Sequence, residues 1–102
     1  MNPWKHEVDP LVIRRVGKMT EECGELIAVC GRIQIQGLNA IDPSSGKTNI
    51  QRLLEEMADV QAQIDVTIAK LLSLRLPEFE ARVEQKSEQM SQWEIALRAE
   101  GL

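Results

Sequence analysis

A nine-residue pattern occurs twice in this chain, at Lys18–Leu26 and, thirty-four residues later, at Arg52–Val60. Each copy has a basic residue, an apolar residue, any residue, two glutamates, an apolar residue, a small residue, an acid and an apolar residue. In a helix, residues three apart lie on the same flank, so the last two acids of each copy face one way. Two such helices packed together would gather four carboxylates: Glu22, Glu25, Glu56 and Asp59. Carboxylates gathered away from bulk water commonly bind a hard divalent cation through oxygen.

The first copy lies in a predicted helix that runs from Pro10 to about Gln36. Asp9 before Pro10 is typical of an N-cap followed by proline at the first helical position. Gly37 and Asn39 supply the stop. The apolar residues of this helix recur in steps of four and three, which is the helical period: Val12, Val16, Met19, Cys23, Leu26, Cys30 and Ile33.

A small residue occupies the same place in both copies, Gly24 in the first and Ala58 in the second. A glycine inside a helix costs about 1 kcal/mol relative to alanine unless something must approach closely there. We therefore predict close packing of the two motif helices at these residues.

The second copy lies in a helix opened by Thr48 and Gln51, which have the spacing of a capping box. We expect this helix to end near Arg75, ahead of Pro77. Its stripe again follows steps of three and four: Ile50, Leu53, Met57, Val60, Ile64, Ile68 and Leu71.

A third helix is predicted after a very short turn at Leu76-Pro77, which favours an antiparallel pair with the second. Its stripe contains Phe79, Val83, Lys86, Met90, Trp93 and Leu97. Lys86 stands where an apolar residue is expected, so its side chain either reaches the edge of the core or points into a polar site.

Two segments lie outside these helices, an N-terminal arm at residues 1–9, with Trp4 as a packing anchor, and a loop at residues 38–47. Gly46-Lys47-Thr48 does not belong to a phosphate-binding loop, because Ile41 stands where the first glycine of that motif is required. The loop is either a connector or a lid beside a site.

The fold class predicted is all-α, as one domain of residues 1–102 with three to four helices. The two motif helices form an antiparallel hairpin that leaves apolar surface over. We expect oligomerisation to complete it into a four-helix-type bundle.

Composition excludes several classes of partner. The formal net charge is -4 and the pI is about 5.0, which argues against binding a nucleic-acid polymer or an anionic membrane. Cys23 and Cys30 are too far apart along a helix for a disulfide, and His6 alone does not complete a zinc site. No signal peptide or membrane-spanning apolar run is present, so we expect a cytoplasmic protein.

The four acids lie at the border of the apolar stripes or just beyond it, when Cys23 and Met57 are taken as the stripe centres. Glu21 and Glu55 point away and are predicted to have supporting or surface roles. The simpler interpretation is a solvated acidic face. Against it, each copy places like charges four residues apart, which destabilises an isolated helix.

The two copies, Glu21-Glu22-Cys23-Gly24-Glu25 and Glu56-Met57-Ala58-Asp59, resemble the EExxE…ExxD signature of the MazG-like proteins, in the all-α nucleoside triphosphate pyrophosphatase superfamily. The resemblance covers roughly residues 11–100. The motifs are separated by thirty residues, more than the family usually has, and the excess falls in the loop at residues 42–47.

The resemblance implies a Mg²⁺-dependent hydrolase that cleaves a nucleoside triphosphate into the monophosphate and pyrophosphate, often in house-cleaning of nucleotide pools. It implies that Mg²⁺, or Mn²⁺ in its place, is held by Glu22, Glu25, Glu56 and Asp59, which are then both the catalytic and the metal-binding residues. It also implies a homodimer or a dimer of dimers. Phosphoribosyl-ATP pyrophosphohydrolases and dimeric dUTPases belong to the same superfamily, and the four acids do not separate these activities.

Four cations are candidates for binding the substrate's phosphates: Lys86, because of its place on the stripe, and Lys18, Arg75 and Arg82. Each has an ordinary surface role as its simpler interpretation. The alternative to an enzyme is a non-catalytic helical interaction module, which the apolar stripes fit equally well.

Overall fold

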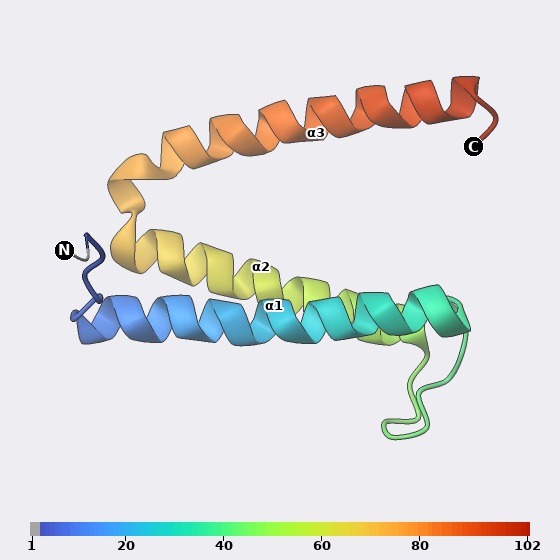
Figure 1. Ribbon diagram of the computed structural model, residues 1–102, viewed down its shortest axis with the longest axis horizontal. Coiled ribbons are helices and arrows are strands. Elements are labelled where there is room, and N and C mark those ends of the chain that lie inside the picture. The colour runs from blue at the N-terminus through green and yellow to red at the C-terminus, as the bar shows by residue number, and fades with distance from the viewer. Residues whose placement is uncertain (1–2) are drawn as a thin grey trace. The chain divides into compact units, whose positions relative to one another are not determined.

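The computed structural model describes residues 3–102 and is all-helical, as predicted (Figure 1). Its elements are α1 (Pro10–Gln36), α2 (Asn49–Leu71), a single 3₁₀ turn η1 (Ser73–Arg75) and α3 (Leu76–Ala99). Within the described residues, β structure is limited to an isolated bridge between Ile41 and Thr48. Residues 1 and 2 of the predicted arm lie outside the described range.

The chain divides into two compact units, Met1–Leu71 and Leu72–Leu102. The first contains α1 and α2, which lie side by side and run in opposite directions as a hairpin (Figure 1). The second contains η1 and α3. The antiparallel pairing of the second and third helices stays a prediction.

The predicted start and end of α1 are confirmed. The Asp9 carboxylate accepts a hydrogen bond of 2.9 Å from the Leu11 amide, and Pro10 opens the helix. At the other end Gly37 takes a positive φ of 92°, and its amide donates to the Ile33 carbonyl at 2.8 Å. A residue with a Cβ is strained at that φ, which is why glycine ends the helix here.

The capping box of α2 is also confirmed, but the predicted end of that helix is wrong. The Thr48 amide donates to Gln51 Oε1 at 2.9 Å, and the Gln51 amide donates to Thr48 Oγ1 at 3.2 Å. The helix ends at Leu71 rather than near Arg75, and the chain turns through η1. Pro77 lies in the first turn of α3, where its missing N–H costs nothing, so the turn falls before Leu76 rather than at Leu76-Pro77.

The contact between α1 and α2 is centred on different residues from those expected. Glu22 and Glu56, placed by the sequence at the border of the apolar stripes, are buried, with exposed fractions of 9% and 3%. Met57, the expected stripe centre, is 52% exposed. The seam therefore lies about one residue, roughly 100° of helical rotation, away from the predicted centre.

This rotation gives the hairpin two different faces. Counting about 100° per residue from the two buried glutamates, the other acids of the motif fall to one side of the seam. Four exposed apolar residues fall on the other side, Val16 and Ile27 of α1 and Leu54 and Met57 of α2, whereas Val66, which is 39% exposed, falls on the side of the acids. Because the helices are antiparallel and carry the same motif, both sets of acids share one face, which we call the acid face, and the opposite face is apolar.

Close packing does not explain the small residues. Gly24 and Ala58 are both exposed, and a Cβ added at Gly24 meets nothing within 4 Å. The predicted packing role for this pair is therefore wrong within the hairpin.

Few of the other described side chains are buried. The helix α3 contains no buried residue, and Trp4, the expected anchor of the arm, is exposed. Both cysteines are free and partly buried. None of the described helices has an apolar stretch long enough to cross a bilayer.

Candidate metal centre

The four acids predicted from the repeated motif lie together where the acid face meets the seam between the two helices. Glu22 and Glu25 come from α1, and Glu56 and Asp59 come from α2. One carboxylate oxygen from each lies within 4.8 Å of the corresponding oxygens of the other three. The antiparallel hairpin thus brings together residues that are more than thirty positions apart in the chain.

The cluster has a buried side and an open side. Glu22 and Glu56 lie in the seam between the helices, whereas Glu25 and Asp59 are exposed. A ligand arriving from solvent therefore meets the two exposed acids first and the two buried glutamates beneath them.

Each buried glutamate has one oxygen paired and one without a partner. Glu22 Oε1 lies 3.5 Å from the Lys18 ammonium, and Glu56 Oε1 lies 3.1 Å from the Arg52 guanidinium. In both residues Oε2 is buried and has no hydrogen-bonding partner among the described residues.

These two buried oxygens fit a hard cation. Leaving a buried charged acceptor unpaired is costly, and a cation that takes oxygen ligands removes that cost. The donor set consists only of carboxylates, which suits Mg²⁺ or Mn²⁺ and not a thiolate- or imidazole-preferring metal.

Burial raises the pKa of Glu22 above its usual value, and the nearby charge of Glu25 adds to this effect. Lys18 opposes the shift, and Asp59 contributes a smaller increase. The pKa of Glu22 therefore reflects the electrostatic cost of assembling the cluster without a cation.

Glu21 and Glu55 occupy matching places beside the cluster and hold cations. Glu21 accepts from Lys18 at 3.2 Å. Glu55 accepts from Lys47 at 2.6 Å and from Arg52 at 3.3 Å, and the hydrogen bond from Lys47 is the main reason why the pKa of Glu55 is lowered. The two residues thus pair with the same cations, Lys18 and Arg52, that pair with Glu22 and Glu56. Their supporting role stays a prediction.

No protein-family model, curated protein or solved structure matches this chain. Function is therefore inferred from the chemistry of the side chains themselves. The site is a group of four carboxylates, two of them buried and two exposed, and each buried one pairs with a basic side chain.

The predicted phosphate-binding cations are distributed between the two units. Lys18 lies at the cluster. Arg75, Arg82 and Lys86 lie in the second unit, where Arg75 forms a two-point ion pair with Glu78 at 2.7 and 3.0 Å. Arg82 and Lys86 share one face of α3 with apolar residues. A substrate-binding role for these three residues stays a prediction.

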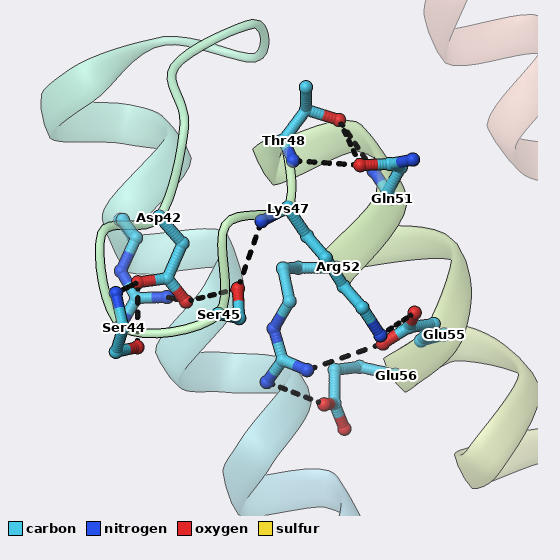
Figure 2. A network of polar contacts seen from close by, with 10 residues as sticks. Asp42, Ser44, Ser45, Lys47, Thr48, Gln51, Arg52, Glu55 and Glu56 are labelled. Atoms are coloured by element: carbon cyan, nitrogen blue, oxygen red, sulfur yellow. Dashed lines mark hydrogen bonds and ion pairs between the residues drawn. The ribbon is translucent and has the colours of Figure 1, made fainter.

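Two cations near the cluster were not among the residues predicted to bind substrate, Arg52 and Lys47 (Figure 2). Arg52 was recognisable as the basic residue that opens the second motif, four residues before Glu56. Lys47 carried no such signal, because its position depends on how the loop between the helices folds.

Proposed function

We propose that this chain is a Mg²⁺-dependent nucleoside triphosphate pyrophosphohydrolase that produces a nucleoside monophosphate and pyrophosphate. The observation that supports this proposal is a cluster of four carboxylates in which one oxygen of Glu22 and one of Glu56 are buried without a hydrogen-bonding partner. Both the cluster and a triphosphate are negatively charged, so an anionic substrate requires a cation between them. When bound, Mg²⁺ supplies charge neutralisation and polarises the phosphoryl group.

In this proposal the side chains divide their work by burial. Glu22 and Glu56 hold the cation from below, each kept in place by the basic residue one turn earlier. Glu25 and Asp59 complete the ligand set at the solvent edge, where they also reach water and substrate. Lys18 and Arg52 each form an ion pair with one oxygen of a buried carboxylate.

The reaction that this site suits is an in-line displacement at the α-phosphorus. The oxygen of a water molecule forms a bond to that phosphorus, while the bond to the oxygen bridging to the β-phosphate breaks. One proton of the water passes to a carboxylate acting as general base. The electron pair of the broken bond leaves with pyrophosphate.

We further propose a homodimer or a dimer of dimers as the assembled form. The apolar face of the hairpin and the apolar stripe of α3 expose large side chains, among them Ile27, Leu54, Met57 and Trp93. Burial of such surface is the main favourable contribution to protein association.

A non-catalytic helical interaction module is the second candidate, and the same exposed apolar face favours it. In that case the acids are a solvated surface whose charges are balanced by Lys18 and Arg52. Metal binding separates the two candidates, because only the metal site requires that Mg²⁺ or Mn²⁺ stabilise the fold.

The test is a panel of standard and modified nucleoside triphosphates, including dUTP and phosphoribosyl-ATP, incubated with Mg²⁺ or Mn²⁺ and assayed for pyrophosphate. We expect release from at least one nucleotide. Glu56→Gln should lower the rate by more than about a hundredfold, because loss of a group that only supports a metal ligand already costs up to that much.

Glu88→Gln, an exposed position on α3, is the matched control and should retain activity. Folding of both variants is checked by circular dichroism without metal. Absence of pyrophosphate from every nucleotide, with folded protein and metal present, would contradict the enzyme proposal.

A further inference from the structure

Two cations converge on Glu55 (Figure 2). This residue precedes Glu56, which is the cluster residue of α2 that lies nearer to the loop along the chain. The Lys47 ammonium lies 2.6 Å from Glu55 Oε1, and the Arg52 guanidinium lies 3.3 Å from Glu55 Oε2. Arg52 also lies 3.1 Å from Glu56, which belongs to the cluster. The Lys47 side chain is 47% exposed, so its ammonium is accessible to a ligand from solvent.

The loop is folded so as to hold the backbone of Lys47 in place. Asp42 is buried, and its carboxylate accepts hydrogen bonds from the Ser44 amide and hydroxyl, the Ser45 hydroxyl and Arg32. The Lys47 carbonyl accepts from the Asp42 amide at 2.7 Å, and the Lys47 amide donates to Ser45 Oγ at 3.2 Å. Only the Lys47 side chain is left free to change partner.

Lys47 also breaks the internal symmetry of the hairpin. Arg52 with Glu55 and Glu56 repeats the arrangement of Lys18 with Glu21 and Glu22. The residue that matches Lys47 thirty-four positions earlier is Ile13, which is apolar. The second copy of the motif therefore has a cation at a position where the first copy has an apolar residue.

We propose that Lys47 binds the β- and γ-phosphates of the substrate, an inference that rests on the proposed pyrophosphohydrolase function. The terminal phosphates carry most of the negative charge of a triphosphate, so they are most stabilised where the two cations converge. On binding, the Lys47 ammonium leaves Glu55 for phosphate oxygens, while Arg52 remains to pair Glu55. The same contact stabilises the negative charge that develops on pyrophosphate as it departs.

The experiment compares Lys47→Ala with the wild-type chain in three measurements: KM for the triphosphate, inhibition by pyrophosphate, and inhibition by the nucleoside monophosphate. We expect KM and the inhibition constant of pyrophosphate to rise about tenfold together, the change expected for one charged hydrogen bond. Inhibition by the monophosphate and stabilisation by Mg²⁺ alone should not change. Lys47→Arg should restore most of the pyrophosphate affinity, and Lys70→Ala, an exposed lysine near the end of α2, is the control.

A double variant separates phosphate binding from simple neutralisation of Glu55. Lys47→Ala also frees a carboxylate, so Lys47→Ala with Glu55→Gln removes that extra charge. If the double variant regains wild-type pyrophosphate affinity, the proposal is wrong, because Lys47 then acts only on Glu55. An active wild-type chain whose Lys47→Ala variant binds pyrophosphate normally overturns this inference alone, whereas an inactive wild-type chain overturns the proposed function.

Discussion

In each copy of the motif, a basic residue precedes a buried glutamate by four positions and pairs with one of its two oxygens. A cation four residues before an acid is the less favourable order in an isolated helix, yet Lys18 with Glu22 and Arg52 with Glu56 both have it. In the hairpin, each cation takes one oxygen of a buried glutamate and leaves the other oxygen unpaired. The arrangement is unfavourable for an isolated helix, and it leaves two buried oxygens that a bound cation would pair.

Replacement of Glu22 tests the cost of assembling the cluster. The pKa of Glu22 is raised in the folded chain, so the folded state binds a proton more strongly than the unfolded state does. That contribution favours folding at low pH and is lost as the pH rises from about 4.5, the reference pKa, through the folded pKa. When a chelator removes divalent metal ions, Glu22→Gln should therefore have a larger free energy of unfolding than the wild type at pH 7. This difference should shrink as the pH falls toward 4.5.

The measurement is urea unfolding across this pH range, and Glu84→Gln, at an exposed site on α3, is the control. Addition of Mg²⁺ should make the wild type more stable than Glu22→Gln, because the variant loses at least about tenfold in metal affinity. An identical pH dependence for Glu22→Gln and the wild type would contradict the electrostatic account of the cluster.

At the scale of elements, local chemistry made the helix starts predictable. Asp9 with Pro10 and Thr48 with Gln51 act within four residues of each other, so their patterns are visible in sequence. The end of α2 was misplaced because Pro77 is compatible with the first turn of a new helix as well as with a break. Ser73–Arg75, which were expected to continue α2, form the 3₁₀ turn η1.

The orientation of the helices was harder to predict than their extent. A stripe repeating every three and four residues shows that a helix has an apolar side, but the arc is wide. The predicted centre of this side was Cys23 and Met57, whereas the buried residues of the motif, Glu22 and Glu56, lie at its edge. The four acids were nevertheless found, because the repeat fixes their relative phase. The position of Lys47 beside Glu55 was not predictable from the sequence, since it depends on contacts of Asp42 with distant Arg32.

The loop between α1 and α2 should depend on the Asp42 carboxylate. Hydrogen bonds from Ser44 and Ser45, and the charge of Arg32, lower the pKa of Asp42. This stabilisation is present above the reference pKa of 3.8 and is lost as the pH falls through the lower folded pKa. Asp42→Asn should speed amide hydrogen exchange of residues 42–48 at neutral pH by about tenfold, because charged hydrogen bonds are replaced by weaker ones.

Asp65→Asn provides the comparison, since Asp65 is exposed and accepts one hydrogen bond, from Gln61. It should leave exchange in the loop unchanged. Unaltered exchange in Asp42→Asn would show that the backbone hydrogen bonds of the loop hold it without the carboxylate.

At the scale of the whole molecule, the two faces of the hairpin serve different purposes. The acid face gathers charge, and under the proposed function it needs access to solvent and substrate. The apolar face presents side chains such as Ile27, which is 70% exposed. It does not need access to solvent or substrate under the proposed function. Burial of exposed apolar surface favours association, which is the physical reason for proposing a second copy on this face.

Ile27→Lys tests whether the apolar face mediates assembly. If another copy covers this face, a lysine there places an unpaired charge in the interface, and the dissociation constant should rise by about tenfold or more. Light scattering over a range of protein concentrations measures the effect. The control is Ala28→Lys, which adds the same charge about 1.5 Å further along α1 and about 100° around the helix. A wild-type chain that is monomeric at all concentrations, or an Ile27→Lys variant that assembles normally, would rule out an oligomer built on this face. Equal disruption by both variants would point instead to a general effect of added charge on α1.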